Sequence, residues 1–413
     1  MDENSSESYI NPKDAQIYGF SLSTNKIPGL SSVRFTINQL DTLIYNPDSL
    51  PHGTSLSKAL CTLTLQYASA VIMAEATNDT VVWKSTDSID FSQPVKIRVF
   101  SYDGSTTKTY TVKINVHQQQ GDAFSWKLLT DKALNRPITE QRTVFFRNHY
   151  YTYIKGEQEV FTSPNDGESW FPLEIQDFPL TADLFSLQVL DNMLCVATTD
   201  GELHISSDGR KWEKQDNTPQ IKTLLGAYNG KLLAIVEKDG KNCFTTTNDL
   251  LTWEYSSEEI PNSFPVAGFG AASNEYGLIV ACGKDSDGKL LNSVWLTNDG
   301  LSWTLLTDEK NHVLDKREGV AIVYYAECYY AFGGRKPAGD DWTYVSDVYV
   351  SQTNGVTWTK TDIALNDFYT PRAFASAHIK DNKLFLFGGA NNDNAWIDDV
   401  WRGFLNKLGF EKK

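Results

Sequence analysis

The stretch SPNDGESW, from Ser163 to Trp170, joins a turn of small polar residues to a tryptophan. The pattern returns as SSDGRKW (206–212), TTNDLLTW (246–253), LTNDGLSW (296–303) and SQTNGVTW (351–358). Tryptophans in corresponding contexts stand at 126, 170, 212, 253, 303, 358 and 401, so the steps between them are 44, 42, 41, 50, 55 and 43 residues. Steps of this length are typical of the blades of a β-propeller.

Each unit between these tryptophans contains four short strand-like segments. In the second unit they are separated by Asp-Asn, Asp-Gly and Ser-Asp-Gly turn signals. The segments are FSLQVL (185–190), MLCVATT (193–199), ELHISS (202–207) and KWEKQ (211–215). Helical periodicity is not sustained anywhere, so the sequence predicts an all-β protein.

The two ends of the array predict how the ring closes. The last unit supplies three strands, RAFASAHI (372–379), KLFLFGG (383–389) and DDVWRGFL (398–405), and then the sequence ends without a fourth. A spare strand, FSWKLLT (124–130), stands before the first complete unit. We predict that it pairs with the strand near 399–405, which gives a six-bladed propeller over residues 122–413 with no open sheet edge.

The repeated turn has a structural explanation. A turn between the third and fourth strands needs a residue that tolerates positive φ, together with side chains that bond to nearby backbone amides. Glycine supplies that residue at 167, 209, 300 and 355. The tryptophan that follows can pack between neighbouring blades, so we interpret the motif as a feature of the fold.

These residues also carry family resemblances. SPNDGESW resembles the Asp-box (Ser-x-Asp-x-Gly-x-Thr-Trp) of sialidase-like and other secreted propellers, with Asn165 at the Asp position. Other copies depart from the motif: Leu250 stands at the glycine position, and Ile205 and Leu296 stand at the leading Ser. The last two units resemble kelch repeats through FGGR (332–335) with SDVYV and FGGA (387–390) with DDVW. Both resemblances imply a propeller and leave its activity open.

Residues 8–118 have a different pattern. VRFTI, CTLTLQY, PVKIRVFSYDG and KTYTVKINV are alternating strands whose number and length predict one β-sandwich. The final segment of this region, YDGSTTKTYTVKI (102–114), is similar to immunoglobulin-like or cadherin-like modules of envelope lipoproteins in Gram-negative bacteria. This resemblance implies an exported protein in which the sandwich is a spacer between an anchor and the propeller. HQQQGD (117–122) is the predicted linker.

Composition limits the classes of partner. The chain has 37 Lys+Arg and 52 Asp+Glu, and its net charge of −15 disfavours nucleic acid and anionic membranes. We expect a monomer whose only membrane contact is an N-terminal lipid anchor ahead of this sequence, although MDENSSESY has no signal pattern. The five cysteines lack metal or disulfide spacing and are predicted to be mostly buried. We expect no metal or cofactor, and DSDG (285–288) is predicted to be a turn.

Candidate ligand-binding residues fall at one end of the ring. Arg142, Arg317 and Arg372 stand near the starts of inner strands in blades one, five and six, and together could hold a carboxylate or sulfate. The longest loops between second and third strands, 333–347 and 388–399, belong to the same sector. They add aromatic and polar groups suited to sugar rings, namely Arg335, Asp340, Trp342, Tyr344, Asn391, Asn392, Asp393 and Trp396.

Four readings of this face remain open. The preferred one is an exported, non-catalytic protein that binds a glycan or protein partner through Arg142, Arg317, Arg335, Trp342, Tyr344, Arg372 and Trp396. A sialidase-like, glycan-cleaving enzyme would need a tyrosine nucleophile and acidic partners, for which Tyr369, Asp367, Glu140 and Glu318 are candidates. A third reading is a scaffold for protein assembly. A fourth is that the arginines form hydrogen bonds that stabilise the fold.

Overall fold

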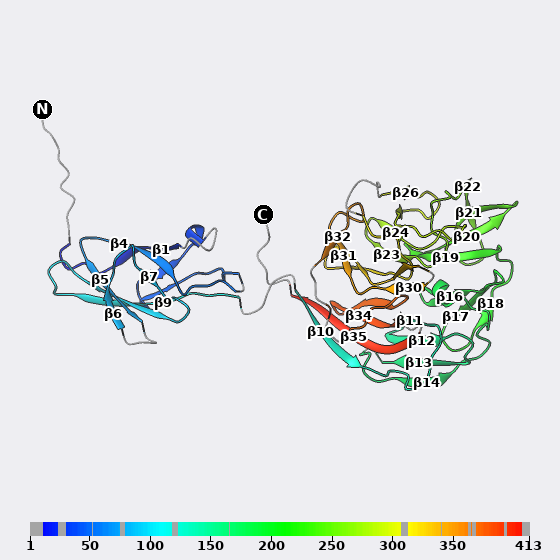
Figure 1. Cartoon of the computed structure of the whole chain (residues 1–413), viewed down its shortest axis with the longest axis horizontal. Helices are drawn as coiled ribbons and strands as arrows, with labels where there is room; N and C mark the ends of the chain where they lie inside the picture. The colour runs from blue at the N-terminus through cyan, green and yellow to red at the C-terminus, as the bar shows by residue number, and fades with distance from the viewer. Residues whose placement is uncertain are drawn as a thin grey trace, which may run out of the picture. The chain divides into compact units, whose positions relative to one another are not determined.

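The computed structural model describes residues 11–23, 30–51, 53–74, 79–117, 123–164, 166–306, 313–339, 341–361, 365, 369–391 and 395–406. The chain forms two compact units that separate between Ala123 and Phe124. Both are built from β-strands with two short 3-10 turns, η1 (Leu30–Ser32) and η2 (Leu184–Ser186), which confirms the predicted all-β class (Figure 1). No helix in these ranges is long and apolar enough to span a membrane. Residues 118–122 of the predicted linker lie outside the described residues.

The N-terminal unit is a sandwich of two sheets. One sheet has the order β1-β4-β7, and the other β2-β3-β9-β8-β5-β6. The first consists of β1 (Ile17–Ser23), β4 (Ala59–Leu65) and β7 (Ser88–Ile89). The second consists of β2 (Thr36–Asn38), β3 (Leu43–Tyr45), β5 (Ser69–Ala74), β6 (Asp79–Val82), β8 (Val95–Phe100) and β9 (Thr107–Lys113). Alternate residues of both sheets, such as Ile17 and Ile97, enter one hydrophobic core.

The C-terminal unit consists of six four-stranded sheets, the blades of the predicted propeller. Blade one is β11 (Gln141–Phe146), β12 (His149–Ile154), β13 (Glu159–Ser163) and β14 (Phe171–Glu174). Blade two is β15 (Gln188–Leu190), β16 (Met193–Ala197), β17 (Leu203–Ser206) and β18 (Glu213–Lys214). Blade three is β19 (Ile221–Tyr228), β20 (Lys231–Lys238), β21 (Lys241–Thr247) and β22 (Glu254–Glu259).

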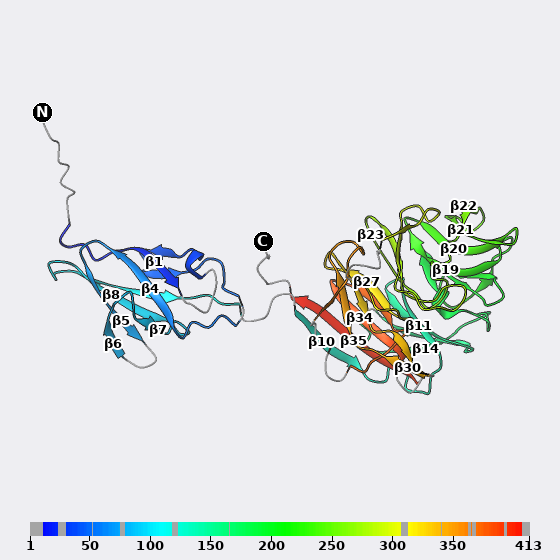
Figure 2. The same ribbon diagram turned by 45° about the horizontal axis from the view of Figure 1, so that its top comes forward.

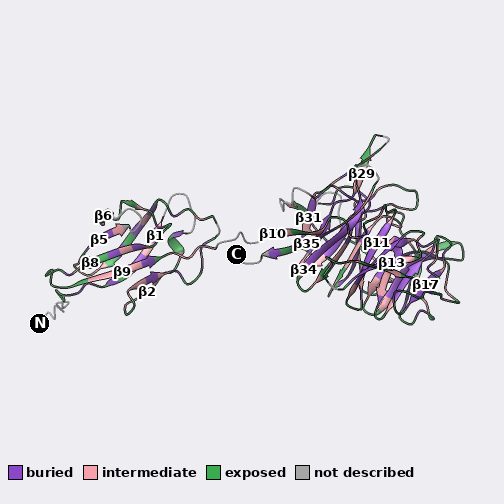
Figure 3. Cartoon of the chain, turned by 90° about the horizontal axis from the view of Figure 1, so that it is seen from below, coloured by how far each residue is buried: buried purple, intermediate pink, exposed green. Residues whose placement is uncertain are grey.

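The last three blades complete the ring. Blade four is β23 (Gly270–Asn274), β24 (Gly277–Ala281), β25 (Val294–Thr297) and β26 (Thr304–Leu305). Blade five is β27 (Ala321–Tyr325), β28 (Cys328–Phe332), β31 (Val348–Ser351) and β32 (Thr359–Thr361). The hairpin β29 (Arg335–Ala338) and β30 (Asp341–Tyr344) is inserted in blade five and projects from the propeller (Figure 3). Blade six is β33 (Ser376–Lys380), β34 (Lys383–Ala390), β35 (Trp396–Asn406) and β10 (Ala123–Thr130).

Blade six confirms the predicted closure. β10 from the start of the unit lies beside β35 from its end, as both views in Figures 1 and 2 show. On β10, the Phe124 ring lies 5.4 Å from the ring of Tyr330 in blade five, and Trp126 lies 6.1 Å from Phe332. The closing strand therefore also joins the hydrophobic core between blades five and six.

The turns between third and fourth strands share one hydrogen bond. In each, a Ser or Thr hydroxyl accepts from the N–H of a residue with positive φ. These pairs are Ser163 with Gly167, Ser206 with Gly209, Thr247 with Leu250, Thr297 with Gly300 and Ser351 with Gly355, at 2.8–3.0 Å. The alignment of the repeats placed Ile205 and Leu296 at the leading Ser. That was wrong by one residue, because Ser206 and Thr297 supply the hydroxyl groups.

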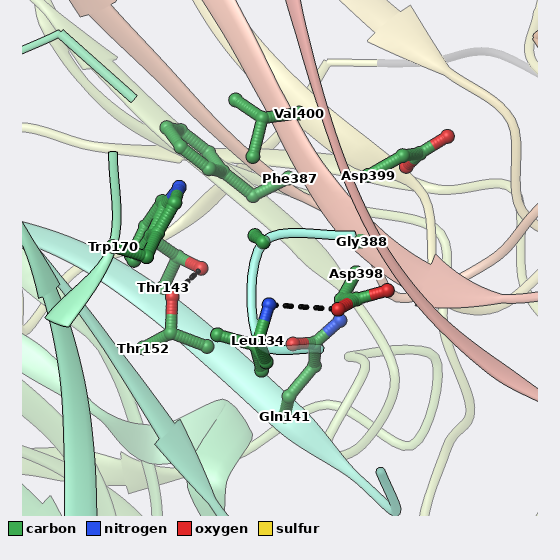
Figure 4. Close-up of a pocket in the computed structure, with 11 residues that line it drawn as sticks. Leu134, Gln141, Thr143, Thr152, Trp170, Phe387, Gly388, Asp398, Asp399 and Val400 are labelled. Atoms are coloured by element: carbon green, nitrogen blue, oxygen red, sulfur yellow. Dashed lines mark hydrogen bonds between the residues drawn. The ribbon is translucent and has the colours of Figure 1, made fainter. Parts of the chain in front are cut away.

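The seam between blades six and one is tightly packed (Figure 4). Asp398 Oδ2 accepts from the N–H of Leu134 at 2.8 Å, and Gln141 Nε2 donates to the carbonyl of Ile397. A hollow of about 10 Å³ lies beside these groups, lined by Thr143, Thr152 and other residues. Because that volume is about one water molecule, the seam is structural and offers no ligand site.

His378 connects the same two blades and predicts a pH dependence. Its Nε2 lies 2.8 Å from the carbonyl oxygen of Thr143. Burial lowers the pKa of His378 to about 4, and the charge of Arg142 acts in the same direction. The unfolded chain has a histidine pKa of about 6.5. The stabilisation by neutral His378 is therefore present above about pH 6.5 and is lost as the pH falls towards 4, at up to about 1.4 kcal/mol per pH unit.

Urea unfolding of the wild type and His378→Gln between about pH 7 and pH 5 measures this contribution. Gln can still donate to the Thr143 carbonyl but does not titrate. The free energy of unfolding should therefore fall less steeply with acid in the variant, and equal slopes would contradict the prediction.

The cysteines behave largely as expected. Cys61, Cys195, Cys243 and Cys282 are buried, Cys328 is partly exposed, and all five are free thiols.

Candidate functional site

Two of the predicted ligand-binding arginines are buried and paired. Arg317 and Arg372 are each 1% exposed. Arg317 donates to Asp347 at 2.6 Å and to the Gly333 carbonyl at 2.8 Å. Arg372 donates through both terminal nitrogens to Asp399 and also to the Gly388 carbonyl at 3.1 Å.

Each of these arginines links the segment before an inner strand to residues at or next to the facing ends of the second and third strands of the same blade. Neither guanidinium is open to a ligand, which corrects their assignment to the binding site. Both instead fit the reading in which the arginines stabilise the fold.

Arg142 differs from these two. It lies on β11 opposite Tyr153, whose ring packs against Trp212 of blade two, so Arg142 shares the face of blade one that looks towards blade two. Its buried Nε has no partner, and its guanidinium forms no hydrogen bond or ion pair with the described residues. Burial lowers the pKa of Arg142 to about 10, against the opposing charge of Asp183. Of the three arginines, Arg142 keeps its donors available.

Arg335, Glu318 and Lys284 form a charged cluster beside Trp342. Arg335 and Lys284 each bond to the buried Glu318 carboxylate at 2.8 Å. The Arg335 guanidinium lies 4.3 Å from the centroid of the Trp342 ring, and the Lys284 ammonium lies 5.0 Å from it. Tyr344 is buried below, with its hydroxyl 3.4 Å from Arg335. Arg335 and Trp342 thus lie in contact, whereas Tyr344 is buried beneath them.

A groove of about 520 Å³ has Trp342 in its lining. It lies between the β24–β25 loop of blade four and the β29–β30 hairpin of blade five. Its lining consists of Lys284, Gly288, Lys289, Leu290, Lys316, Pro337 and Trp342. Lys289 and Lys316 are exposed and form no ion pair with the described residues. We call this the lysine groove.

Three partly exposed aromatic rings meet next to this cluster. Phe374 and Trp396 belong to blade six, and Phe185 lies on η2 in the approach to blade two. The centroid of Phe185 is 4.9 Å from that of Phe374 and 6.4 Å from that of Trp396. Because blades two and six flank blade one, these contacts pass over the inner end of blade one at the channel mouth. We call these residues the aromatic trio.

The tyrosine of the sialidase-like alternative is buried. Tyr369 is 6% exposed, lies in the core between blades five and six, and burial raises its pKa to about 12. A hydroxyl in this environment is a poor nucleophile, so the assignment of Tyr369 is corrected. Asp367, Asp340, Asn392 and Asp393 lie outside the described residues, and Asn391 is partly exposed.

Two carboxyl groups near Arg142 have unusual environments. Burial raises the pKa of Glu140, whose carboxylate lies 3.2 Å from Lys155, and burial likewise raises the pKa of Asp183. Asp183 Oδ1 also accepts from the N–H of Phe185 and caps η2. Glu140 is one of the acidic candidates of the sialidase-like alternative, whereas the sequence patterns did not indicate Asp183.

Among the described residues, no group of three His, Cys, Asp or Glu side chains could hold a metal ion. The DSDG segment is a turn, as predicted. Asp285 Oδ1 accepts from the N–H groups of Asp287 and Lys289 at 3.0 and 2.8 Å. This turn directs Lys289 to the lysine groove.

Two family models match the chain. The model of the DUF6242 beta propeller domain matches residues 120–413, and that of the domain of unknown function (DUF6242) N-terminal domain matches residues 7–114. Among solved structures, one titled "Structure of YjhT" is 13% identical with a TM-score of 0.52, covering 66% of this chain and 96% of that chain. At this identity the likeness supports the fold alone. A search of curated proteins finds no match.

Proposed function

The chain belongs to the DUF6242 family, and we propose that its propeller binds an acidic glycan without cleaving it. The observation that carries this proposal is the lysine groove, which three lysines line together with Trp342. Lysine side chains attract sulfate and carboxylate groups, and an aromatic ring offers a face to the C–H groups of a sugar. A glycan with acidic residues combines both features.

Local charge favours this ligand despite the net charge of −15. The residues that line the groove include three lysines and no carboxylate. Charges more than about 8–10 Å away are largely screened by physiological salt. An acidic group in the groove therefore meets the exposed ammonium groups of Lys289 and Lys316, whereas Lys284 is already paired with Glu318, and its binding should weaken as salt increases.

Charge reversal at the exposed lysines tests the proposal. Binding of heparin-derived and polygalacturonate-derived hexasaccharides is measured by calorimetry for the wild type, Lys289→Glu and Lys316→Glu. We expect each variant to lose roughly 3- to 10-fold in affinity for one of the two probes, because each removes one attraction and adds one repulsion. The melting temperature should hardly change, since both side chains are exposed.

Lys211→Glu is the matched control. Lys211 is also exposed, but it follows the turn after the third strand of blade two, at the other end of the propeller. The control should bind like the wild type. Absence of wild-type binding to both hexasaccharides, or equal losses in all three variants, would contradict the proposal.

A second candidate function is cleavage of such a glycan. The observation that favours it is the pair of carboxyl groups with raised pKa, Glu140 and Asp183, next to the unpaired Arg142. Carboxyl groups in such environments can serve as general acids. Turnover of a panel of sialosides, sulfated glycans and uronic-acid glycans that is lost in Glu140→Gln or Asp183→Asn would favour the enzyme over the binding protein.

We further propose that the protein acts outside the cytoplasm as a monomer, with the N-terminal sandwich as a spacer. The support is the resemblance of that sandwich to modules of envelope lipoproteins. Fractionation of cells that produce the full-length protein, combined with protease treatment of intact cells, tests this localisation.

A further inference from the structure

Phe374 has a backbone conformation that is unusual for its residue type. In blades four, five and six, the residue two positions before the inner strand has a positive φ. These residues are Gly268, Gly319 and Phe374, with φ of 62°, 70° and 62°. A continuous pair of hydrogen bonds links the three, since Gly319 N–H donates to the Gly268 carbonyl and Phe374 N–H to the Gly319 carbonyl, both at 2.7 Å. Glycine adopts this left-handed conformation freely, whereas a bulky L-residue does so rarely.

Phe374 is only partly buried: with Trp342 and Trp396 it packs against the small buried cluster of Tyr344, Ala373 and Ala390. Leu250 also has a left-handed φ, of 62°, but its side chain is buried in the core between blades two and three. Phe374 remains partly exposed, although glycine would satisfy the same backbone hydrogen bonds. Residues held in sparsely populated backbone conformations cluster at functional sites.

The strain places the Phe374 ring within the aromatic trio. Its plane is inclined by 39° to that of Phe185 and by 33° to that of Trp396. The guanidinium of Arg335 lies 5.0 Å from its centroid and 4.3 Å from that of Trp342, so the trio adjoins the wall of the lysine groove. A ligand that extends from the groove past Trp342 and Arg335 would therefore meet the trio.

We propose that Phe374, Phe185 and Trp396 form a stacking platform for a sugar ring of the acidic glycan. This inference rests on the proposed function and extends it. The ligand is an oligosaccharide with an acidic residue in the lysine groove and a ring with an apolar C–H face over the channel mouth. The three rings are inclined by 27–39° to one another, and a partly exposed ring among them can offer its face to the sugar, while Arg335 can donate to hydroxyl groups at the boundary.

The test uses Phe374→Gly and Phe374→Ala in the full chain, with the same two hexasaccharides as probes. Both variants should lose roughly 3- to 10-fold in affinity for the hexasaccharide that the wild type prefers, because the stacking partner is removed. Phe374→Gly should also melt at a higher temperature than Phe374→Ala, since glycine has no Cβ to strain the left-handed backbone. Phe171→Ala, which removes an exposed aromatic residue from the outer strand β14, should bind normally.

The outcomes separate this inference from the proposed function. If Lys316→Glu weakens binding while both Phe374 variants bind like the wild type, the glycan occupies the groove but not the trio, and the inference is overturned. The same holds if Phe374→Gly and Phe374→Ala unfold together, because the ring would then support the fold. If the wild type binds neither probe, the proposed function itself fails.

Discussion

Arg372→Ala is expected to lower the free energy of unfolding by about 3–5 kcal/mol, because it removes one partner of a buried ion pair. Arg372 is held by Asp399, the Gly388 carbonyl and, through Nε, the Thr370 carbonyl at 3.0 Å. Its guanidinium also lies 4.0 Å from the ring centroid of Tyr369. Without the guanidinium, the Asp399 carboxylate keeps one side-chain donor among the described residues. This donor is the indole N–H of Trp401, at 2.7 Å. Chemical denaturation monitored by tryptophan fluorescence measures the loss.

Two further variants identify the cause. Arg372→Met combined with Asp399→Asn removes both charges, and the amide oxygen that the second change introduces can still accept from Trp401, so the double variant should be more stable than Arg372→Ala. Arg210→Ala, at an exposed arginine in the turn of blade two, should change stability by less than about 0.5 kcal/mol. If Arg372→Ala is instead as stable as the wild type and loses affinity for the glycan, the original assignment of Arg372 to the ligand site is right.

The sequence contains a signal that Arg317 and Arg372 are paired with aspartates, and their assignment to a ligand site overlooked it. Arg317 and Arg372 have partners at the start of their third strands, in SDVYV and DDVW, which are the segments that carry the kelch resemblance. The recurrence of Arg, Gly-Gly and Asp in both blades is a pairing signal. Arg142 has no such aspartate in blade one, and it is the arginine that remains unpaired.

The architecture could be predicted because it depends on local and repeated features. A residue that accepts positive φ, a hydroxyl three or four positions earlier and a following tryptophan define each turn, even where Leu250 replaces glycine. The aromatic trio could not be predicted in this way. Phe185 meets Phe374 only because the ring brings blades two and six together over blade one, and nothing in either local sequence records that contact.

The lysine groove could be predicted only in part. Lys289 follows the predicted DSDG turn and Lys316 immediately precedes Arg317, so each could have been placed at the same end of the ring. Their meeting with Trp342 depends on the conformation of the β29–β30 hairpin, in which Trp342 pairs with Pro337. Hairpin register within a long loop is set by contacts that the repeat does not share.

Removal of β10 is expected to have the largest effect on the propeller. A chain that begins at residue 118 should retain a cooperative melting transition, whereas one that begins at residue 131 should not. The shorter chain lacks the fourth strand of blade six, which leaves β35 as an open edge and exposes the apolar surface that Phe124 and Trp126 cover. Differential scanning calorimetry and limited proteolysis compare the two. Equal melting temperatures would show that ring closure does not depend on β10.

A point substitution tests the same closure within the full chain. Gly403 on β35 lies directly under Trp126, and a Cβ placed there would come within 2.7–3.0 Å of three ring atoms. Gly403→Val should therefore displace the indole and destabilise the seam by about 1–3 kcal/mol, the usual cost of overpacking. Trp126→Ala removes the ring and should also destabilise. The two changes together should cost less than the sum of their separate effects, since the valine then occupies space that the indole has left. Additive losses would mean that Gly403 is required for its backbone conformation and not for its contact with the closing strand.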